Sequence, residues 1–253
     1  QPVRVWDLVS PLMVGFMAAV LPARAGEFVR AYLLGKSQNI SFGSSFATIV
    51  VERLFDMIML LIMLAWVLVF HAGIFESDAT WSGISVSTLA FQFGLFSLIL
   101  VVALVAFLYL LAFRREVAIK LVRWCVSLLP KKWQEKILNL VGTFSEGLSV
   151  VRQPAALLKV SLTTVLVWGL IVLAYYPLYF AYDLKDTSAA SLVLLTLMIC
   201  ILITLLPTPA FLGSFNAGVL IALHEIMHEA EVAAVSFGFV AWGINFMVVT
   251  VGG

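Results

Sequence analysis

The sequence is short of charge, cysteine and histidine. Only 11% of its 253 residues are charged, the net charge is +1, and it has two cysteines and three histidines. A chain with so little excess charge offers no basic surface for DNA or RNA, so we expect no nucleic-acid partner. Cys125 and Cys200 show no spacing motif, so neither predicts a disulfide or a metal site. No nucleotide-binding motif occurs either, and we expect no cofactor.

Apolar residues are what the chain has in excess. They make up 63% of the sequence, the mean hydropathy is +1.10, and the runs Ser85–Phe113 and Thr187–Leu223 carry no charge. A soluble core of this size cannot hide so much apolar surface, so the composition predicts an all-α, polytopic integral membrane bundle. A membrane-spanning helix needs about 20 apolar residues. Six windows reach or approach that length: 6–22, 44–70, 86–113, 156–182, 187–206 and 230–251.

The linker 114–153 between the third and fourth windows is basic. It carries eight Lys or Arg residues against three Glu, whereas the loop 71–84 has two acids and no Lys or Arg. The positive-inside tendency therefore predicts that the linker is cytoplasmic. It divides one transmembrane domain, 1–253, into two halves. Because Gln1 is not an initiator and the chain stops straight after an apolar window, we expect it to be part of a longer polypeptide.

The same linker has an apolar stripe. Ile137, Val141, Phe144 and Leu148 recur at spacings of four, three and four, which predicts an amphipathic helix. Such a helix either packs on its neighbours or lies at the membrane interface, where anionic lipid headgroups would attract it.

The segment LPARAGEFVRAYLLG, 21–35, places Arg24, Glu27 and Arg30 between two apolar windows. It is too polar to span a membrane and too apolar for a free loop, and Pro22 and Gly26 suit a loop that turns into a short helix. We expect either an interfacial helix whose arginines reach the headgroups or a re-entrant helix covered by protein or a water-filled cavity.

The window 44–70 favours the second of these two interpretations. Glu52, Arg53 and Asp56 lie inside it. If its helix starts near Ser41, Glu52 is 11 residues in, roughly 16 Å deep in an apolar layer about 30 Å thick. Glu52 and Asp56 are four apart and repel each other unless a cation intervenes. Arg53 meets only part of that demand, which favours re-entry of the preceding segment with Arg24 or Arg30 as its partner. A purely structural ion-pair cluster is the alternative.

A weak internal repeat predicts a second broken helix. LPTPAFLGSF, 206–215, follows an apolar window as LPARAGEF does, breaks it with proline, and reaches Gly-x-Phe before another helix. Broken helices in corresponding positions of two halves point to a midplane binding site in transporters, although a proline pair can also simply end a helix. Counting windows puts both breaks on the cytoplasmic side, which predicts parallel rather than inverted repeats.

HEIMH, at 224–228, fits the H-E-x-x-H zinc pattern, in which two histidines bind the metal and the glutamate acts as base. The remaining histidine, His71, is expected on the opposite side of the membrane, so no third ligand is evident. We interpret His224, Glu225 and His228 as the polar end of a helix and predict no metal there, with a zinc hydrolase as an alternative.

Three motifs in order resemble the lysylphosphatidylglycerol synthase transmembrane-domain family, which includes the membrane half of the bacterial multiple peptide resistance factor. The first, R-x-G-E, matches Arg24, Gly26 and Glu27; the second, E-R-x-x-D, matches Glu52, Arg53 and Asp56. The third, P-x-P-G-G-x-G-x-x-E, keeps Pro207, Pro209 and Gly213. It has Ala210 and Phe211 where glycines are usual and Asn216 where an acid is usual.

The resemblance implies a lipid translocase, or flippase, in a prokaryotic cytoplasmic membrane. It does not imply synthesis, because the sequence holds no counterpart of the soluble aminoacyl-transferring domain, so the chain is expected to be a transporter rather than an enzyme. The expected partners are membrane lipids, phospholipid or polyprenyl-linked, with a second copy or a lipid-synthesising protein as candidate protein partners. A non-transporting lipid-binding or scaffold subunit is the alternative from another class.

We expect the motif residues to act together on the lipid. Arg24 and Arg30 would attract a phosphate, since arginine offers bidentate contacts. Glu27, Glu52 and Asp56 would hold those arginines and contact a cationic headgroup, while Arg53 anchors the network. The prolines and Gly213 would shape the opposing wall, with Asn216 as a neutral hydrogen-bonding group.

Overall fold

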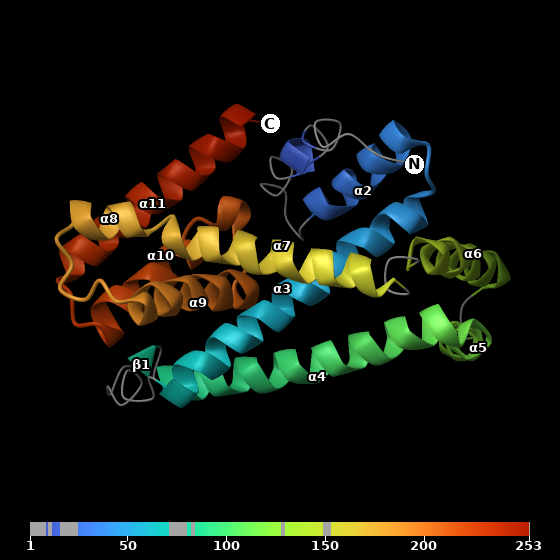
Figure 1. Ribbon diagram of the computed structural model, residues 1–253, viewed down its shortest axis with the longest axis horizontal. Coiled ribbons are helices and arrows are strands. Elements are labelled where there is room, and N and C mark those ends of the chain that lie inside the picture. Colours follow the sequence, from blue (N-terminus) through green and yellow to red (C-terminus); the bar gives the residue numbers. More distant parts are fainter. Residues whose placement is uncertain are drawn as a thin grey trace.

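The computed structural model describes residues 9, 12–15, 25–70, 80–81, 84–127, 130–148 and 153–252, and in these it is almost entirely helical (Figure 1). This confirms the all-α prediction. The helices are α2 (Ala25–Gln38), α3 (Phe42–Phe70), α4 (Val86–Phe113), α5 (Arg115–Cys125), α6 (Lys131–Gly147), α7 (Pro154–Leu173), α8 (Tyr176–Ala181), α9 (Ala189–Leu205), α10 (Ser214–Leu220) and α11 (Glu231–Gly252). A 3₁₀ turn, η5 (Pro209–Phe211), precedes α10, and a π-helical turn, η6 (Ile221–Ile226), follows it. Two short strands, β1 (Thr80–Trp81) and β2 (Ile84–Ser85), pair antiparallel before α4.

Five helical stretches of the described residues are long and apolar enough to cross a membrane: Phe42–Phe70, Phe91–Phe113, Pro154–Ala181, Pro209–Ile226 and Glu231–Val248. Four of them coincide with expected windows. The window 187–206 appears as α9, a shorter apolar helix of 17 residues, and the window 6–22 lies largely outside the described residues. The protein is therefore an integral membrane protein, with a distribution of spans that differs from the expected six.

Helix α3 is the central element, and its two halves pack into different cores. The first half joins α4, α5 and α6 through Ala47, Val51 and Leu54. The second half joins α7, α9, α10 and α11 through Met63, Leu64 and Val67. In Figure 1, α3 runs obliquely from the α2 end of the molecule towards the α8–α9 end. The charged residues of α3 (Glu52, Arg53 and Asp56) alternate along the helix with residues of the first core.

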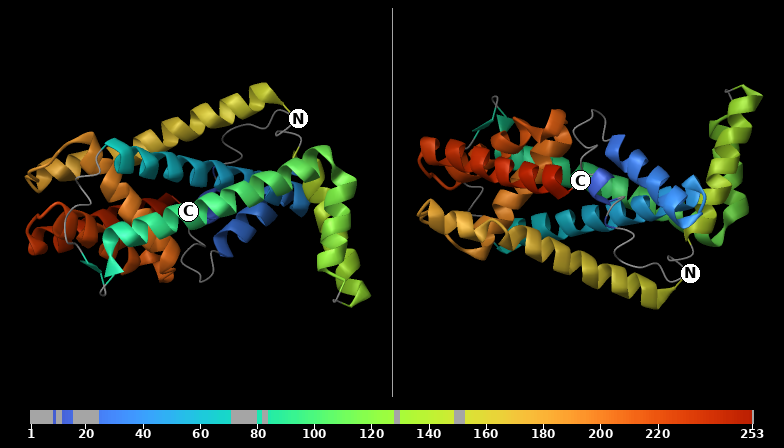
Figure 2. Two further views of the ribbon diagram at one scale, coloured as in Figure 1. Left: turned by 90° about the horizontal axis from the view of Figure 1, so that it is seen from below. Right: turned by 90° about the horizontal axis from the view of Figure 1, so that it is seen from above.

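The basic linker forms a helical hairpin, α5–α6, that lies across one end of the bundle in both views of Figure 2. Its amphipathic helix α6 packs on the start of α3: Ser44 Oγ donates to the Thr143 carbonyl at 2.9 Å, and the rings of Phe46 and Phe144 lie 6.5 Å apart. Gly43 leaves no room for a β-carbon against Thr143. Of the two alternatives for this helix, packing on its neighbours is thus observed for α6.

The second proline break produces a helical hairpin. After α9 the chain turns at η5 and returns as α10 and η6, and Gly218 of α10 approaches so closely that an added β-carbon would meet the Ile199 backbone of α9 at 2.7 Å. The start and the end of the hairpin lie side by side, because the Lys185 backbone N–H donates to Glu229 Oε1 at 2.8 Å. The window 187–206 is therefore one arm of a hairpin.

This geometry corrects the expectation of parallel repeats. Helix α2 ends next to the start of α3, at the α5–α6 end of the bundle, whereas the α9–α10 hairpin has both its ends at the opposite end of the molecule (Figure 1). The number of spans expected before the second proline break was wrong, because the 17-residue helix α9 has the composition of a membrane span. The two short helical elements enter from opposite ends.

The tip of the α9–α10 hairpin has a backbone suited to glycine. Ala210, Phe211 and Gly213 have φ values of 51°, 58° and 92°. These are the positions at which the resembled motif usually carries glycine. Left-handed backbone costs a residue with a β-carbon about 1–2 kcal/mol, so the third motif is a turn motif, and this chain tolerates strain at two of its three positions.

We therefore expect Ala210→Gly to stabilise the fold by about 1 kcal/mol, because it relieves the left-handed strain. Gly213→Ala is the matched opposite: a β-carbon there meets nothing within 4 Å, so its loss of stability, about 1–2 kcal/mol, is purely conformational. The midpoint of thermal unfolding in detergent measures both. A lower midpoint for Ala210→Gly would contradict the assignment.

Candidate functional site

The site begins where α2 runs back along α3. Their junction places Arg30 level with Glu52, ten residues into α3 and roughly 15 Å along it at 1.5 Å per residue. Arg30 Nη1 donates to Glu52 Oε1 at 2.9 Å and Nη2 to Oε2 at 2.8 Å, a bidentate pair. Two planar groups matched in this way form the stronger kind of ion pair. The pair fixes the register of the two helices.

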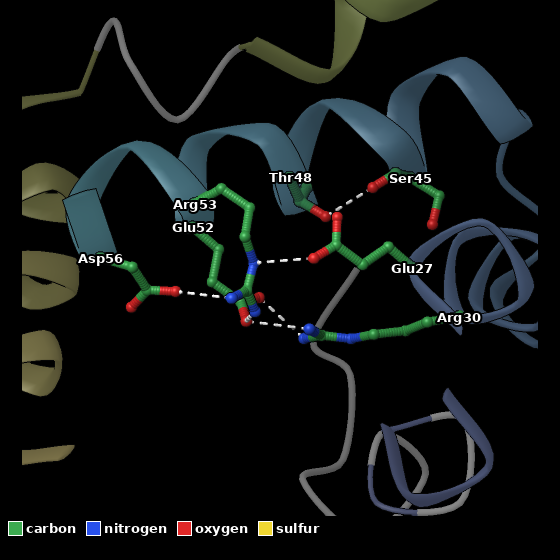
Figure 3. A network of polar contacts seen from close by, with 7 residues as sticks. All are labelled: Glu27, Arg30, Ser45, Thr48, Glu52, Arg53 and Asp56. Carbon is green, nitrogen blue, oxygen red and sulfur yellow. Dashed lines mark hydrogen bonds and ion pairs between the residues drawn. The ribbon is translucent and has the colours of Figure 1, made fainter. Parts of the chain in front are cut away.

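Arg53 is the hub of the remaining contacts (Figure 3). Its Nη2 lies 3.1 Å from Glu52 Oε1, its Nη1 lies 3.1 Å from Asp56 Oδ2, and its Nε lies 3.4 Å from Glu27 Oε1. One guanidinium thus separates three carboxylates. Arg53 is the cation that the repulsion between Glu52 and Asp56 requires.

Asp56 extends the network to α7. Its Oδ1 accepts the indole N–H of Trp168 at 3.0 Å, and Trp168 is otherwise buried in the core formed by the second half of α3, α9 and α11. Trp168 was not among the residues predicted from the sequence. A tryptophan inside an apolar window is a usable signal, because its N–H needs an acceptor where there is no water.

A groove of about 380 Å³ lies between α3 and α7 beside the network. Two carboxylates and three threonine hydroxyls contribute to its lining, and valines complete it. The lining residues are Thr48, Val51, Glu52, Asp56, Val160, Thr163, Thr164 and Val167. The charged network therefore borders an open space between two membrane-spanning helices.

Comparison with known proteins places this arrangement in a family. The model of the lysylphosphatidylglycerol synthase TM region matches residues 1–253. The chain belongs to this lysylphosphatidylglycerol synthase transmembrane family. It is also similar to glycosyltransferase AglD of Haloferax volcanii, with 51% identity over 39 residues, which are 15% of this chain and 6% of that protein. No solved structure matches the chain.

The family motifs occupy two separate places in the structure. Glu27, from the first motif, meets the second motif through Arg53, and Gly26 is buried in the first turn of α2. Arg24 and Pro22 lie outside the described residues.

The third family motif lies at the α9–α10 hairpin. The described hydrogen bonds around Pro207, Pro209 and Gly213 stay near the hairpin, as between Thr208 and Ser214 at 2.9 Å. Asn216 Oδ1 lies close to Gly238 of α11 and has no hydrogen-bond partner among the described residues. The structure thus brings the first two motifs together and places the third motif elsewhere.

HEIMH does not form one face of a regular helix. His224 lies in the π-helical turn, its Nδ1 is 2.8 Å from the Glu229 carbonyl oxygen, and His228 has a left-handed backbone with φ of 55°. The zinc pattern needs two histidines one α-helical turn apart. Within the described part of the chain, no group of three or more His, Cys, Asp or Glu side chains is arranged to hold a metal ion.

We therefore keep the prediction that HEIMH binds no zinc. His224→Ala should leave the metal content of the purified protein unchanged, because the described residues place no third ligand with the two histidines. Elemental analysis of the purified chain and the variant measures this. One equivalent of zinc per wild-type chain that disappears in His224→Ala would establish the hydrolase alternative instead.

Proposed function

We propose that this chain translocates a lipid between membrane leaflets and uses the α2–α3 ion-pair network as its headgroup site. The position of the network supports this most strongly. Five charged side chains meet near the middle of a 29-residue apolar helix. Ionisable groups at such a depth are costly and typically line a substrate path or a water-filled cavity. The adjoining groove supplies a space for a headgroup.

Each charged residue has a role in this proposal. Two of the five guanidinium N–H groups of Arg30 bond to Glu52, and the others serve as donors to a lipid phosphate. Arg24 is proposed as a second phosphate ligand because it precedes α2 in the first motif. Glu27, Glu52 and Asp56 hold the arginines in place. Arg53, which contacts all three acids, is the anchor.

The surroundings follow from the same proposal. The basic hairpin α5–α6 lies on the cytoplasmic side of a prokaryotic inner membrane, in line with its excess of Lys and Arg. The substrate is a phospholipid or a polyprenyl-linked lipid. The resemblance of a short segment to a protein named as a glycosyltransferase favours a second candidate function, a lipid-binding subunit that presents its lipid to a modifying enzyme without moving it.

Glu52→Gln tests the proposal. The variant removes the carboxylate that pairs with Arg30 at membrane depth, at a cost of about 3 kcal/mol, the lower end for breaking a buried pair because Glu52 is partly exposed. We expect the rate at which labelled phospholipid is translocated in reconstituted vesicles to fall at least about tenfold. This corresponds to an activation free energy that is higher by about 1.4 kcal/mol. Glu135→Gln, on the exposed face of α6, is the matched control and should behave as wild type.

Arg30→Lys separates recognition from structure. It keeps the charge but loses the bidentate fork, so we expect folded protein with slower translocation. If both variants lower thermal stability while the surviving protein translocates normally, the network is only structural. If wild type binds lipid in detergent but moves none in vesicles, the lipid-binding subunit replaces the translocase.

A further inference from the structure

The hairpin α5–α6 leaves the bundle at the level where a membrane-spanning helix ends. Helix α4 carries no charged side chain along its whole length, and Arg114 directly follows its last residue, Phe113. Helix α5 begins one residue later. In both views of Figure 2 the hairpin runs across the direction of the bundle helices, and one of its ends extends beyond the bundle. A segment placed in this way lies at the boundary between the apolar layer and water, where the lipid headgroups are.

The apolar stripe of α6 extends farther than the protein on which it packs. Val141 and Phe144 pack against the first core, next to the start of α3. Leu140 is four residues before Phe144 and Trp133 a further seven, so both share its helix face, yet they are 43% and 59% exposed. The face of α6 that contacts the membrane-spanning helix α3 therefore continues outwards past it, on the side where lipid surrounds the bundle.

Helix α5 has an exposed apolar stripe as well. Val117, Leu121 and Trp124 follow one another at spacings of four and three, which puts them on one helix face, and they are 48%, 49% and 78% exposed. Trp124 lies in the last turn of α5 and Trp133 in the first turn of α6. Both tryptophans are thus near the end of the hairpin that extends beyond the bundle. Tryptophan concentrates at membrane interfaces because its ring is apolar and its N–H is polar.

The exposed charges of the hairpin are mostly positive. Among its described side chains, five exposed cations stand against two exposed acids: Arg114, Lys120, Arg123, Lys131 and Lys136 against Glu116 and Glu135. The ion pairs found in the described part of the chain all lie in the α2–α3 network, so none of them neutralises these cations. Lys136 Nζ lies 5.7 Å from the centre of the Trp133 ring. An ammonium group beside an indole suits the headgroup layer, because the ring can enter it while the charge stays among the phosphates.

We propose that the exposed stripes and cations of α5–α6 form a docking surface for an anionic lipid leaflet. Trp124 and Trp133 enter the headgroup layer, and the neighbouring Lys and Arg side chains contact the lipid phosphates. A zwitterionic leaflet accepts the tryptophans but does not attract the cations, so docking depends on the charge of the lipid. The surface is separate from the α2–α3 network, and this proposal goes beyond the proposed function because it does not require that the chain move any lipid.

The native Cys125 can report on docking. It is exposed and lies four residues after Leu121, on the stripe of α5. The chain with Cys200→Ala, in which Cys125 is the one remaining cysteine, is inserted as single chains into nanodiscs of phosphatidylcholine, alone or mixed with phosphatidylserine. An uncharged water-soluble maleimide labels it, so that the surface potential does not change the local reagent concentration. We expect labelling to be at least about tenfold slower in the anionic discs, because each Lys or Arg near an anionic surface contributes about fivefold to docking.

Variants tie this protection to the hairpin. The double variant Lys120→Gln, Arg123→Gln removes two cations near Cys125 and should return labelling in anionic discs to about the rate in phosphatidylcholine. Lys185→Gln is the charge control, since it removes a cation at the opposite end of the molecule, between α8 and α9, and should leave the protection unchanged. Asn139→Cys, with both native cysteines replaced by alanine, places the thiol on the exposed side of α6 away from its apolar stripe and should label equally fast in both discs.

Three results would overturn the proposal. Equal, rapid labelling of Cys125 in both kinds of disc means that the stripe stays in water. Slow labelling in both, unchanged in the double variant, means that the charge of the lipid has no part in covering the stripe. Protection that appears only in discs holding two chains assigns the surface to a second copy of this chain.

Discussion

The bidentate pair between Arg30 and Glu52 is the contact on which the arrangement of the first half depends. An arginine or a glutamate at membrane depth is tolerated only with a partner, and each of these residues finds its partner on the other helix. The pair therefore requires α2 to fold back along α3. Once α2 is there, Glu27 reaches Arg53, and the three acids and two arginines close into one network.

The network lies where apolar packing leaves room for it. The two cores divide α3, one around Val51 and Leu54 and the other around Met63 and Leu64, and Glu52, Arg53 and Asp56 alternate along the helix with residues of the first core. Trp168 joins the charges to the second core, since its ring is buried there while its N–H bonds to Asp56. A polar site and two apolar cores thus share one helix without any charge entering either core.

The sequence predicted the class of fold and the first two motifs well, because charges are rare in it and each one needs a partner. It predicted Arg24 or Arg30 as the partner of Glu52, and the structure shows the pair with Arg30. It did not find Thr163, Thr164 or Trp168, because α7 is apolar on nearly every side and its composition does not indicate which face meets α3. It misread α9 for a related reason: hydropathy measures length and composition, and a hairpin arm of 17 residues resembles a span.

Burial differs between α7 and the α9–α10 hairpin, and this shows which of the two lies inside the protein. In Pro209–Ile226, the returning arm of the α9–α10 hairpin, 44% of the residues are buried, against 6% for the apolar window that overlaps α7. The hairpin also has a close backbone contact at Gly218 and a hydrogen bond from Trp242 to the Ala210 carbonyl. The exposed side chains of α7 include Leu158, Leu162 and Leu166, so its outer surface is of the kind that lipid tails cover. Helix α7 meets the charged network through the Trp168–Asp56 bond, and an apolar helix at the edge of the bundle thus supplies one wall of the groove while the α9–α10 hairpin is enclosed by protein.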